Sequence, residues 1–201
     1  MPSELEIKIR LSSDNQFEST VVLCQNFCSV SGVRMVQLDE YFDTPDEQLK
    51  EQDLTLRLRS IDGDVKVALK SPRVHLASGM TDRIELEFSA ASETEVREQL
   101  KHQGLKVAAA IEKHRWTFAS GGIEIAIDKL PFIGAFLEVE GPDEHTINET
   151  LKSLQLSSYE AVRQNYTELL EAKLAEIGLP LRPNLRATFE VESRWRQEKN
   201  L

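Results

Sequence analysis

Apolar and polar residues alternate with a period of two through much of the first 140 residues. In residues 4–11, ELEIKIRL, every odd position is apolar. Successive side chains of a strand point to opposite faces, so this alternation predicts a half-buried β-strand. The same reasoning predicts strands at residues 36–42, 54–59, 65–70, 83–88, 113–118, 123–128 and 135–140. Glycine-containing turns at 62–64 and 121–122 join two pairs of strands into hairpins, and about eight strands suffice to close a small barrel.

Helices are indicated by four capping boxes, in which Ser or Thr is followed three residues later by Glu or Gln. The pairs are Ser13 with Gln16, Ser92 with Glu95, Thr146 with Glu149, and Ser157 with Glu160. Apolar residues at helical spacing follow each pair. We therefore predict one α+β domain over residues 1–177 and a C-terminal extension, 178–201, packed on it or trailing from it.

Composition narrows the class of protein. The chain has 201 residues, of which 40% are hydrophobic and 29% charged, which is typical of a globular protein that buries a core without disulfides. The net charge of −10 argues against binding to duplex nucleic acid. We expect a cytoplasmic protein without a membrane segment, because no apolar run is long enough and the first residues do not resemble a signal peptide. Cys24 and Cys28 share one face of a predicted helix, where we expect reduced thiols.

The polar positions of the predicted strands are nearly all charged, and they come in like-charged pairs on one face. These pairs are Glu4/Glu6, Lys8/Arg10, Arg57/Arg59, Lys66/Lys70, Glu85/Glu87, Lys113/Arg115 and Glu138/Glu140. Neighbouring like charges repel, so a purely structural design would alternate their signs. Paired carboxylates suit a divalent cation such as Mg²⁺, and paired arginines and lysines suit phosphate oxygens.

This sorting by sign favours a barrel whose charged faces line a tunnel and whose apolar faces lie beneath helices. The alternative is that the charged faces are solvated outer surfaces. His114, Trp116 and Phe118 alternate out of phase with Lys113 and Arg115. We therefore expect these three side chains to pack on the outside, under a helix.

The motif Glu4-x-Glu6-x-Lys8 resembles the ExExK signature of the CYTH, or triphosphate tunnel metalloenzyme, superfamily. Its members include class IV adenylyl cyclases, thiamine triphosphatases and inorganic triphosphatases. Further blocks resemble the family in order over roughly residues 4–170: YFDTP at 41–45, LRLR at 56–59, LKSP at 69–72, RIELE at 83–87, EKHR at 112–115, GAFLEVE at 134–140 and NYTELL at 165–170. The resemblance implies an eight-stranded antiparallel closed barrel with a charged interior and helices outside, which binds a triphosphate with Mg²⁺ or Mn²⁺.

The resemblance also implies roles for individual residues. The metal-binding carboxylates would be Glu4, Glu6, Asp128, Glu138 and Glu140. The triphosphate would be held by Lys8, Arg57, Arg59, Lys70 and Arg115. Strand parity adds further tunnel residues, namely Arg10, Lys66, Arg83, Glu85, Glu87 and Lys113. The helix predicted at 158–176 would cover one mouth of the tunnel.

Three functions remain open at this stage. The first is a metal-dependent triphosphatase that releases the terminal phosphate of tripolyphosphate or of an organic triphosphate. The second is a class IV-type adenylyl cyclase that makes cyclic AMP from ATP. Those cyclases carry a His-Phe element upstream of ExExK, whereas only Met1-Pro2-Ser3 precede Glu4, and the inward positions offer no comparable set of aromatic or amide side chains to hold a purine. We therefore favour hydrolysis over cyclisation.

The third function is a non-catalytic polyphosphate or nucleotide-binding module. The complete carboxylate set disfavours it, because binding alone does not need so many metal ligands. In each case the partner is a small triphosphate-containing molecule. Both a monomer and a homodimer are compatible with the sequence.

Overall fold

The computed structural model describes residues 3–61, 63–179 and 185–200. Asp62, within the turn predicted at 62–64, lies outside the described residues, as do residues 180–184 of the C-terminal extension.

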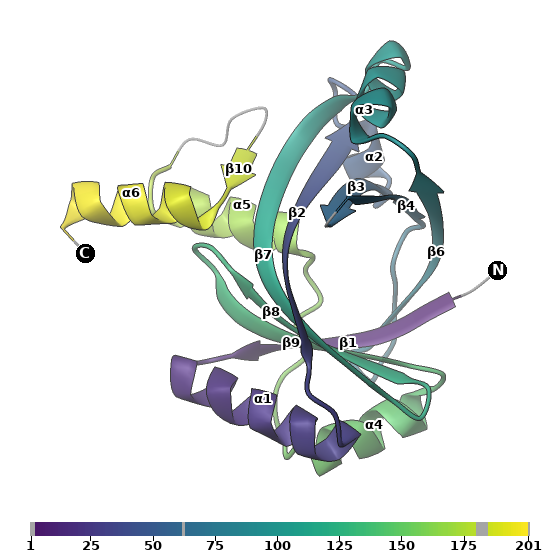
Figure 1. Cartoon of the computed structure of the whole chain (residues 1–201), viewed down its shortest axis with the longest axis vertical. Helices are drawn as coiled ribbons and strands as arrows, with labels where there is room; N and C mark the ends of the chain where they lie inside the picture. Colours follow the sequence, from purple (N-terminus) through teal and green to yellow (C-terminus); the bar gives the residue numbers. More distant parts are fainter. Residues whose placement is uncertain (1–2, 62, 180–184, 201) are drawn as a thin grey trace.

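Eight strands form a closed ring (Figure 1). In ring order they are β1 (Ser3–Leu11), β9 (Gly134–Gly141), β8 (Ile123–Leu130), β7 (Lys106–Ser120), β2 (Val33–Asp43), β3 (Thr55–Ile61), β4 (Asp64–Lys70) and β6 (Thr81–Ala90). The ring closes where β6 pairs with β1, with Glu4 opposite Arg83. All eight pairings are antiparallel, which confirms the barrel predicted from the alternation.

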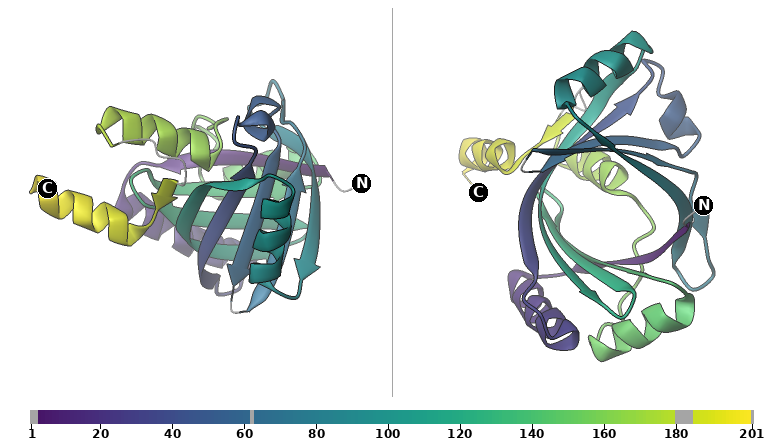
Figure 2. Two further views of the ribbon diagram at one scale, coloured as in Figure 1. Left: turned by 90° about the horizontal axis from the view of Figure 1, so that it is seen from above. Right: turned by 45° about the vertical axis from the view of Figure 1, so that its right-hand side comes forward.

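Two short strands pair with the ring without belonging to it. β5 (Val74–His75) is antiparallel to β6, and β10 (Leu185–Ala187) runs parallel to β7. The right-hand view of Figure 2 looks into the interior of the closed ring.

Helices cover the apolar outer face of the barrel, as the pattern predicted. α1 (Asp14–Cys28) and α4 (Glu144–Ser153) pack on one side of it, where Ile9, Ile125 and Leu137 belong to the largest core cluster and are fully buried. α3 (Glu93–His102) covers a second cluster around Leu58 and Val65. The barrel is thus apolar outside, where it is covered, and charged inside.

The two cysteines of α1 lie within the largest core cluster. Both are buried and free, and burial raises the pKa of each thiol, that of Cys24 to about 12. Both therefore pack as small apolar residues in the core.

Two of the four predicted helix starts are correct and two are wrong. The side chains of Ser13 and Ser92 cap α1 and α3. α4 is instead capped by Asp143, whose carboxylate accepts from Thr146 N at 2.7 Å. α5 (Tyr166–Glu176) begins well after Ser157, with Asn165 as its N-cap in a complete capping box with Glu168.

The late start of α5 has a physical reason. The preceding chain is held against β1: Val162 N donates to the carbonyl of Lys8 at 2.8 Å, and Ala161 forms an isolated bridge with Ile9. Backbone groups that pair with a strand are not available for a helix.

The C-terminal extension packs on the barrel through β10 and α6 (Phe189–Lys199). The Phe189 ring lies 4.5 Å from the ring of His114, and Trp195 meets Phe132 edge-on. Trp116 makes an edge contact with Phe17 of α1, and Phe118 is fully buried. The outward packing expected for residues 114, 116 and 118 is therefore confirmed. None of the described helices is long and apolar enough to cross a membrane.

Candidate functional site

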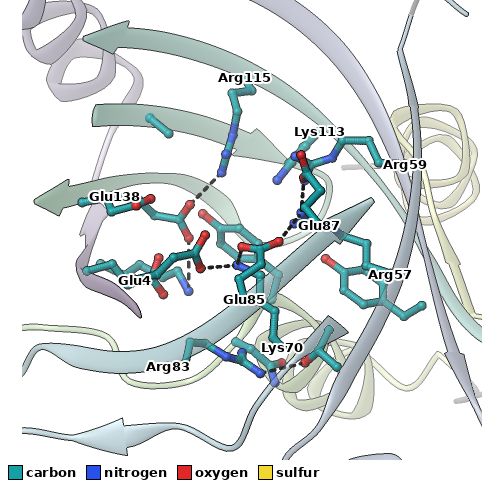
Figure 3. Close-up of a pocket in the computed structure, with 18 of the residues that line it drawn as sticks. Glu4, Arg57, Arg59, Lys70, Arg83, Glu85, Glu87, Lys113, Arg115 and Glu138 are labelled. Atoms are coloured by element: carbon teal, nitrogen blue, oxygen red, sulfur yellow. Dashed lines mark hydrogen bonds and ion pairs between the residues drawn. The ribbon is translucent and has the colours of Figure 1, made fainter. Parts of the chain in front are cut away.

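The charged faces of the strands enclose a cavity of about 440 Å³ inside the barrel (Figure 3). Its cationic lining residues are Lys8, Arg57, Arg59, Lys66, Lys70, Arg83, Lys113 and Arg115. Its carboxylates are Glu4, Glu6, Glu85, Glu87, Glu124, Glu138 and Glu140. The structure therefore brings together all of the predicted site residues except Asp128 and Arg10.

Arg10 shares the strand parity of Lys8 but lies beyond the cavity. Its guanidinium sits over the Phe136 ring, 4.5 Å from the centroid, and donates to the carbonyl of Ile133 at 2.6 Å. Parity fixes the face of a strand that a side chain occupies, but it does not fix the depth along the tunnel.

Asp128 points inward but lies behind the cavity wall, with no exposed surface. Its oxygens accept from Nε and Nη2 of Arg115 at 2.7 and 2.6 Å, and from the Tyr166 hydroxyl at 3.0 Å. The structure thus places this carboxylate as the counter-ion of a cationic wall residue rather than on the cavity surface.

A second buried aspartate has the same arrangement. Asp39 of β2 lies opposite Arg59 of β3, as Asp128 lies opposite Arg115. It accepts from Nε and Nη2 of Arg59 at 2.6 and 2.7 Å, and it is 1% exposed. We call Arg59, Lys113, Arg115, Asp39 and Asp128 the clamp floor.

Lys113 joins the two halves of the clamp floor. Its Nζ lies 3.4 Å from Asp39 Oδ2 and 3.6 Å from Asp128 Oδ2. Burial and the neighbouring Arg115 charge lower the pKa of Lys113 to about 8. Burial alone would raise the pKa of Asp39, but Lys113 and Arg59 hold it well below its usual range. The clamp floor thus carries three bases and two fixed carboxylates.

Carboxylates gather on the adjoining wall. Glu6 of β1 lies opposite Glu140 of β9, which lies opposite Glu124 of β8. We call these three residues and the nearby Glu4 the acidic row. Burial, and then repulsion from Glu124 and Glu6, raise the pKa of Glu140.

Glu4 is tied to two other residues of the cavity. It forms an ion pair with Lys70 at 2.6 Å, and Lys70 also contacts Glu85 at 2.5 Å. Burial and a hydrogen bond with Glu85 raise the pKa of Glu4 to about 8, while the pKa of Glu85 is lowered.

The donor chemistry of this wall suits a hard divalent cation. Carboxylate oxygens are the ligands that Mg²⁺ and Mn²⁺ favour. Burial and neighbouring carboxylates raise the pKa values of Glu4 and Glu140, which a bound cation would reverse. In the described residues, no three carboxylates already converge into a ready-made metal cluster. Glu4 is held by Lys70 instead, and Glu138 by Lys8 and Arg115.

Sequence reasoning missed several residues of the site. Asp39 and Tyr41 share the inward parity of β2, and Glu124 shares that of β8, so alternation could have found them. Asn165, Tyr166 and Thr167 also line the cavity, so it is the start of α5 that reaches the tunnel, at one end of the barrel (Figure 2). Two tyrosines and an amide therefore also line the cavity, two of these three side chains coming from the start of α5 and its N-cap and not from a strand.

Cations and carboxylates thus face one another inside a closed antiparallel barrel. A model of the CYTH domain matches residues 2–168. The chain belongs to the CYTH family.

The similar proteins are described with different activities. A protein of Methanocaldococcus jannaschii, named as a proposed adenylate cyclase, is 29% identical over 176 residues that cover 83% of this chain and 97% of that protein. Among solved structures, a Pyrococcus horikoshii protein is 23% identical with a TM-score of 0.67, covering 83% of this chain and 98% of its own. A Hippeastrum protein described as a proposed adenylyl cyclase with a dominant triphosphatase activity is 19% identical with a TM-score of 0.65, covering 90% of this chain and 99% of its own. The two structures show a shared fold.

Proposed function

We propose that this protein is a divalent-metal-dependent triphosphatase that releases the terminal phosphate of tripolyphosphate or of an organic triphosphate. The observation that carries the proposal is the lining of the cavity, in which eight cationic side chains face seven carboxylates within about 440 Å³. A flexible polyanion and its counter-cation are the ligands that such a lining matches.

The cationic residues bind and orient the phosphate chain. Arg59 and Arg115 each use Nε and Nη2 on internal carboxylates. Each therefore keeps its second Nη for a phosphate oxygen. Lys8, Arg57 and Lys70 add further donors along the same cavity. In phosphoryl transfer, positioning and electrostatic stabilisation supply most of the acceleration, and such fixed donors provide both.

Glu4, Glu6 and Glu140 of the acidic row would hold the metal, together with Glu138 of the same cavity. A bound Mg²⁺ or Mn²⁺ supplies positive charge that offsets the charge developing on the phosphate oxygens. Glu85, whose pKa is lowered and which Lys70 holds at 2.5 Å, is an ionised acceptor that can orient an attacking water.

A class IV-type adenylyl cyclase is the second candidate, and one feature favours it. A cavity of about 480 Å³ adjoins the tunnel and shares Tyr41, Thr55, Asn165 and Thr167 with it. Phe42, Leu54 and Leu56 give this second cavity an apolar part that a nucleoside could occupy. We rank it second because cyclisation also needs the ribose fixed in line with the α-phosphorus, whereas hydrolysis needs only the phosphate chain, the metal and a water.

A panel of substrates separates the candidates. The purified protein is incubated with tripolyphosphate, thiamine triphosphate or ATP, with Mg²⁺, Mn²⁺ or a chelator, and phosphate, pyrophosphate and cyclic AMP are quantified. We expect metal-dependent release of phosphate, faster from tripolyphosphate than formation of cyclic AMP from ATP. The Glu6→Gln variant, purified in parallel, controls for contaminating phosphatases.

The products decide between the three functions. Cyclic AMP with equimolar pyrophosphate as the main products from ATP, and little phosphate from tripolyphosphate, would establish the cyclase. Tight binding of tripolyphosphate without turnover under any metal would establish a non-catalytic binding module.

A further inference from the structure

Asp39 is the most deeply buried acidic residue that faces the tunnel from β2, and the sequence motifs do not include it. It is 1% exposed and does not line the cavity, because Arg59 lies between it and the open space. Both of its oxygens are used: Oδ1 by Arg59 Nε at 2.6 Å, and Oδ2 by Arg59 Nη2 at 2.7 Å and Lys113 Nζ at 3.4 Å. Among the described residues, the side chains that pair with Asp39 are therefore two cations of the proposed site, Arg59 and Lys113.

Arg57, two residues away on the same face of β3, shows what an arginine without such a partner does. It lies opposite Tyr41 instead of an aspartate. Its Nη2 reaches Glu85 at 3.2 Å and Glu87 at 3.9 Å, and its Nε has no partner among the described residues. Arg59 is thus fixed through two parallel hydrogen bonds, whereas Arg57 has one longer hydrogen bond and a more distant ion pair. Bidentate pairing restricts the orientation of a guanidinium.

We propose that Asp39 is a positioning residue that holds Arg59 and Lys113 in the orientation required for turnover. This inference rests on the proposed function, since it assigns a role in the same triphosphate site. Asp39 carries the wrong charge to attract a polyanion, so it would contribute by orienting the two cations that bind one. Loss of Asp39 also removes an acceptor from two buried cations and lowers stability, so the positioning role is tested by kinetics together with the melting temperature.

The geometry predicts an unusual kinetic signature for Asp39→Asn. Removing a negative charge beside a polyanion site leaves binding as strong as before or stronger, because the local potential becomes more positive. Misplacement of the clamps lowers turnover, and an error of about 1 Å can cost about 100-fold. We therefore expect kcat for tripolyphosphate to fall about 10- to 100-fold while KM stays within about threefold or decreases.

Asp43 of the same strand provides a matched control. It is also a buried aspartate, but it accepts hydrogen bonds from the backbone N–H groups of Thr44, Leu49 and Lys50, at 2.7, 2.8 and 3.0 Å. The Asp43→Asn variant should lower the melting temperature without changing kcat or KM for tripolyphosphate. An equal loss of kcat in both variants, in step with their melting temperatures, would reduce Asp39 to a structural residue and overturn the proposal.

A second measurement tests the positioning role without relying on activity. The Nε–Hε resonance of Arg59 is assigned in ¹H–¹⁵N spectra by its absence from Arg59→Lys, and its exchange with water is followed. We expect Asp39→Asn to accelerate this exchange at least about tenfold while the Arg115 signal, anchored on Asp128, is unchanged.

The two measurements separate the possible failures. If the wild-type protein hydrolyses no triphosphate, the proposed function fails, and the Arg59 resonance still decides whether Asp39 fixes the guanidinium. Unchanged exchange at Arg59, or an unchanged kcat in an active protein, would each overturn the positioning role. In a double-mutant cycle, Asp39→Asn should add little to the loss caused by Arg59→Lys, because both changes remove the same bidentate pair.

Discussion

The clamp floor and the acidic row lie in one barrel but differ in how their charges are balanced. In the clamp floor, three basic side chains are paired with two aspartates that are almost completely buried. In the acidic row, Glu6, Glu140 and Glu124 lie side by side on neighbouring strands, where burial and then mutual repulsion raise the pKa of Glu140.

The pKa values of the two regions reflect this difference. The pKa of Asp39 is held well below its usual range, whereas the pKa values of Glu4 and Glu140 are raised above theirs. The clamp floor is therefore complete in the protein alone, while the acidic row is the part of the site that we propose a bound cation completes. Fixed donors cost no reorganisation when a phosphate chain binds, and adjustable carboxylates can accept a metal that enters with it.

The largest effect on stability should come from breaking the clamp floor. Asp128→Ala leaves Arg115, Lys113 and the Tyr166 hydroxyl without their shared acceptor. Removing one partner of a buried ion pair costs about 3–5 kcal/mol. Arg115 retains Glu138 and Lys113 retains Asp39, so we expect the lower end of this range, about 3 kcal/mol. We expect this loss in chemical denaturation.

The acidic row supplies the control for that experiment. Glu140→Ala removes a carboxylate whose neighbours Glu124 and Glu6 repel it. It should leave the free energy of unfolding of the metal-free protein unchanged or increase it. Equal destabilisation by both changes would contradict the difference between the two regions.

The largest effect on activity should come from the acidic row. Glu4→Gln and Glu6→Gln keep the shape of the side chain but remove a ligand charge from one face of β1. We expect a loss of metal-dependent turnover of about 100- to 1,000-fold, comparable to the loss of a key electrostatic group elsewhere in catalysis. Circular dichroism should show an unchanged fold, and full turnover at low metal concentration would contradict the assignment.

The faces of the strands could be predicted from the sequence, whereas depth within the barrel could not. Alternation placed Glu4, Glu6 and Arg57 toward the tunnel, because side chains on a strand alternate in direction. Arg10 obeys the same rule but lies past the end of the cavity, against Phe136. The depth of Arg10 depends on how the strands tilt around the ring, and the sequence of a single strand does not determine that tilt.

Tertiary contacts also override local signals at the helix starts. Ser157 and Glu160 match a capping box as well as Ser13 and Gln16 do, yet the chain near Ala161 pairs with β1 instead. The contribution of α5 to the site, through Asn165, Tyr166 and Thr167, follows from this displaced start. A residue-by-residue pattern carries no information about that contact.

A smaller effect is expected from Arg57, which belongs to neither region. Its contacts with Glu85 and Glu87 are longer than the arginine–aspartate hydrogen bonds of the clamp floor, and Glu85 retains Lys70 when Arg57 is removed. Arg57→Ala should therefore preserve stability and weaken tripolyphosphate binding by about 10- to 100-fold, the value of one charge-assisted contact. Titration calorimetry measures the affinity. A variant that unfolds but binds normally once folded would mean that Arg57 serves the barrel and not the ligand.

The smallest effect should be a dependence of stability on pH that originates at Glu4. The folded protein raises the pKa of this carboxyl to about 8 from an ordinary value of 4.5, chiefly through burial and the hydrogen bond with Glu85. The native state then binds a proton that the unfolded state has released. The stabilising contribution of this proton is complete below pH 4.5 and is lost as the pH rises through 8. Glu85 does not titrate in this window, because its own pKa is lowered to about 2.

Glu4→Gln imitates the protonated carboxyl and should not show this loss. The full pKa shift would correspond to about 3 kcal/mol between pH 5.5 and 8.5, and solvent screening at the partly exposed Glu4 reduces it. In metal-free buffer, the melting temperature of Glu4→Gln relative to the wild type should therefore rise between pH 5.5 and 8.5 by about 2–4 °C, equivalent to about 1 kcal/mol in a chain of this length. Saturating Mg²⁺ should remove the difference by stabilising the ionised carboxylate in the wild type alone. The control is Glu51→Gln on the exposed helix α2 (Gln48–Glu51), which should follow the wild type at every pH. A parallel response of Glu4→Gln and the wild type would mean that Glu4 is already ionised in the empty tunnel, and that the acidic row is as well neutralised as the clamp floor.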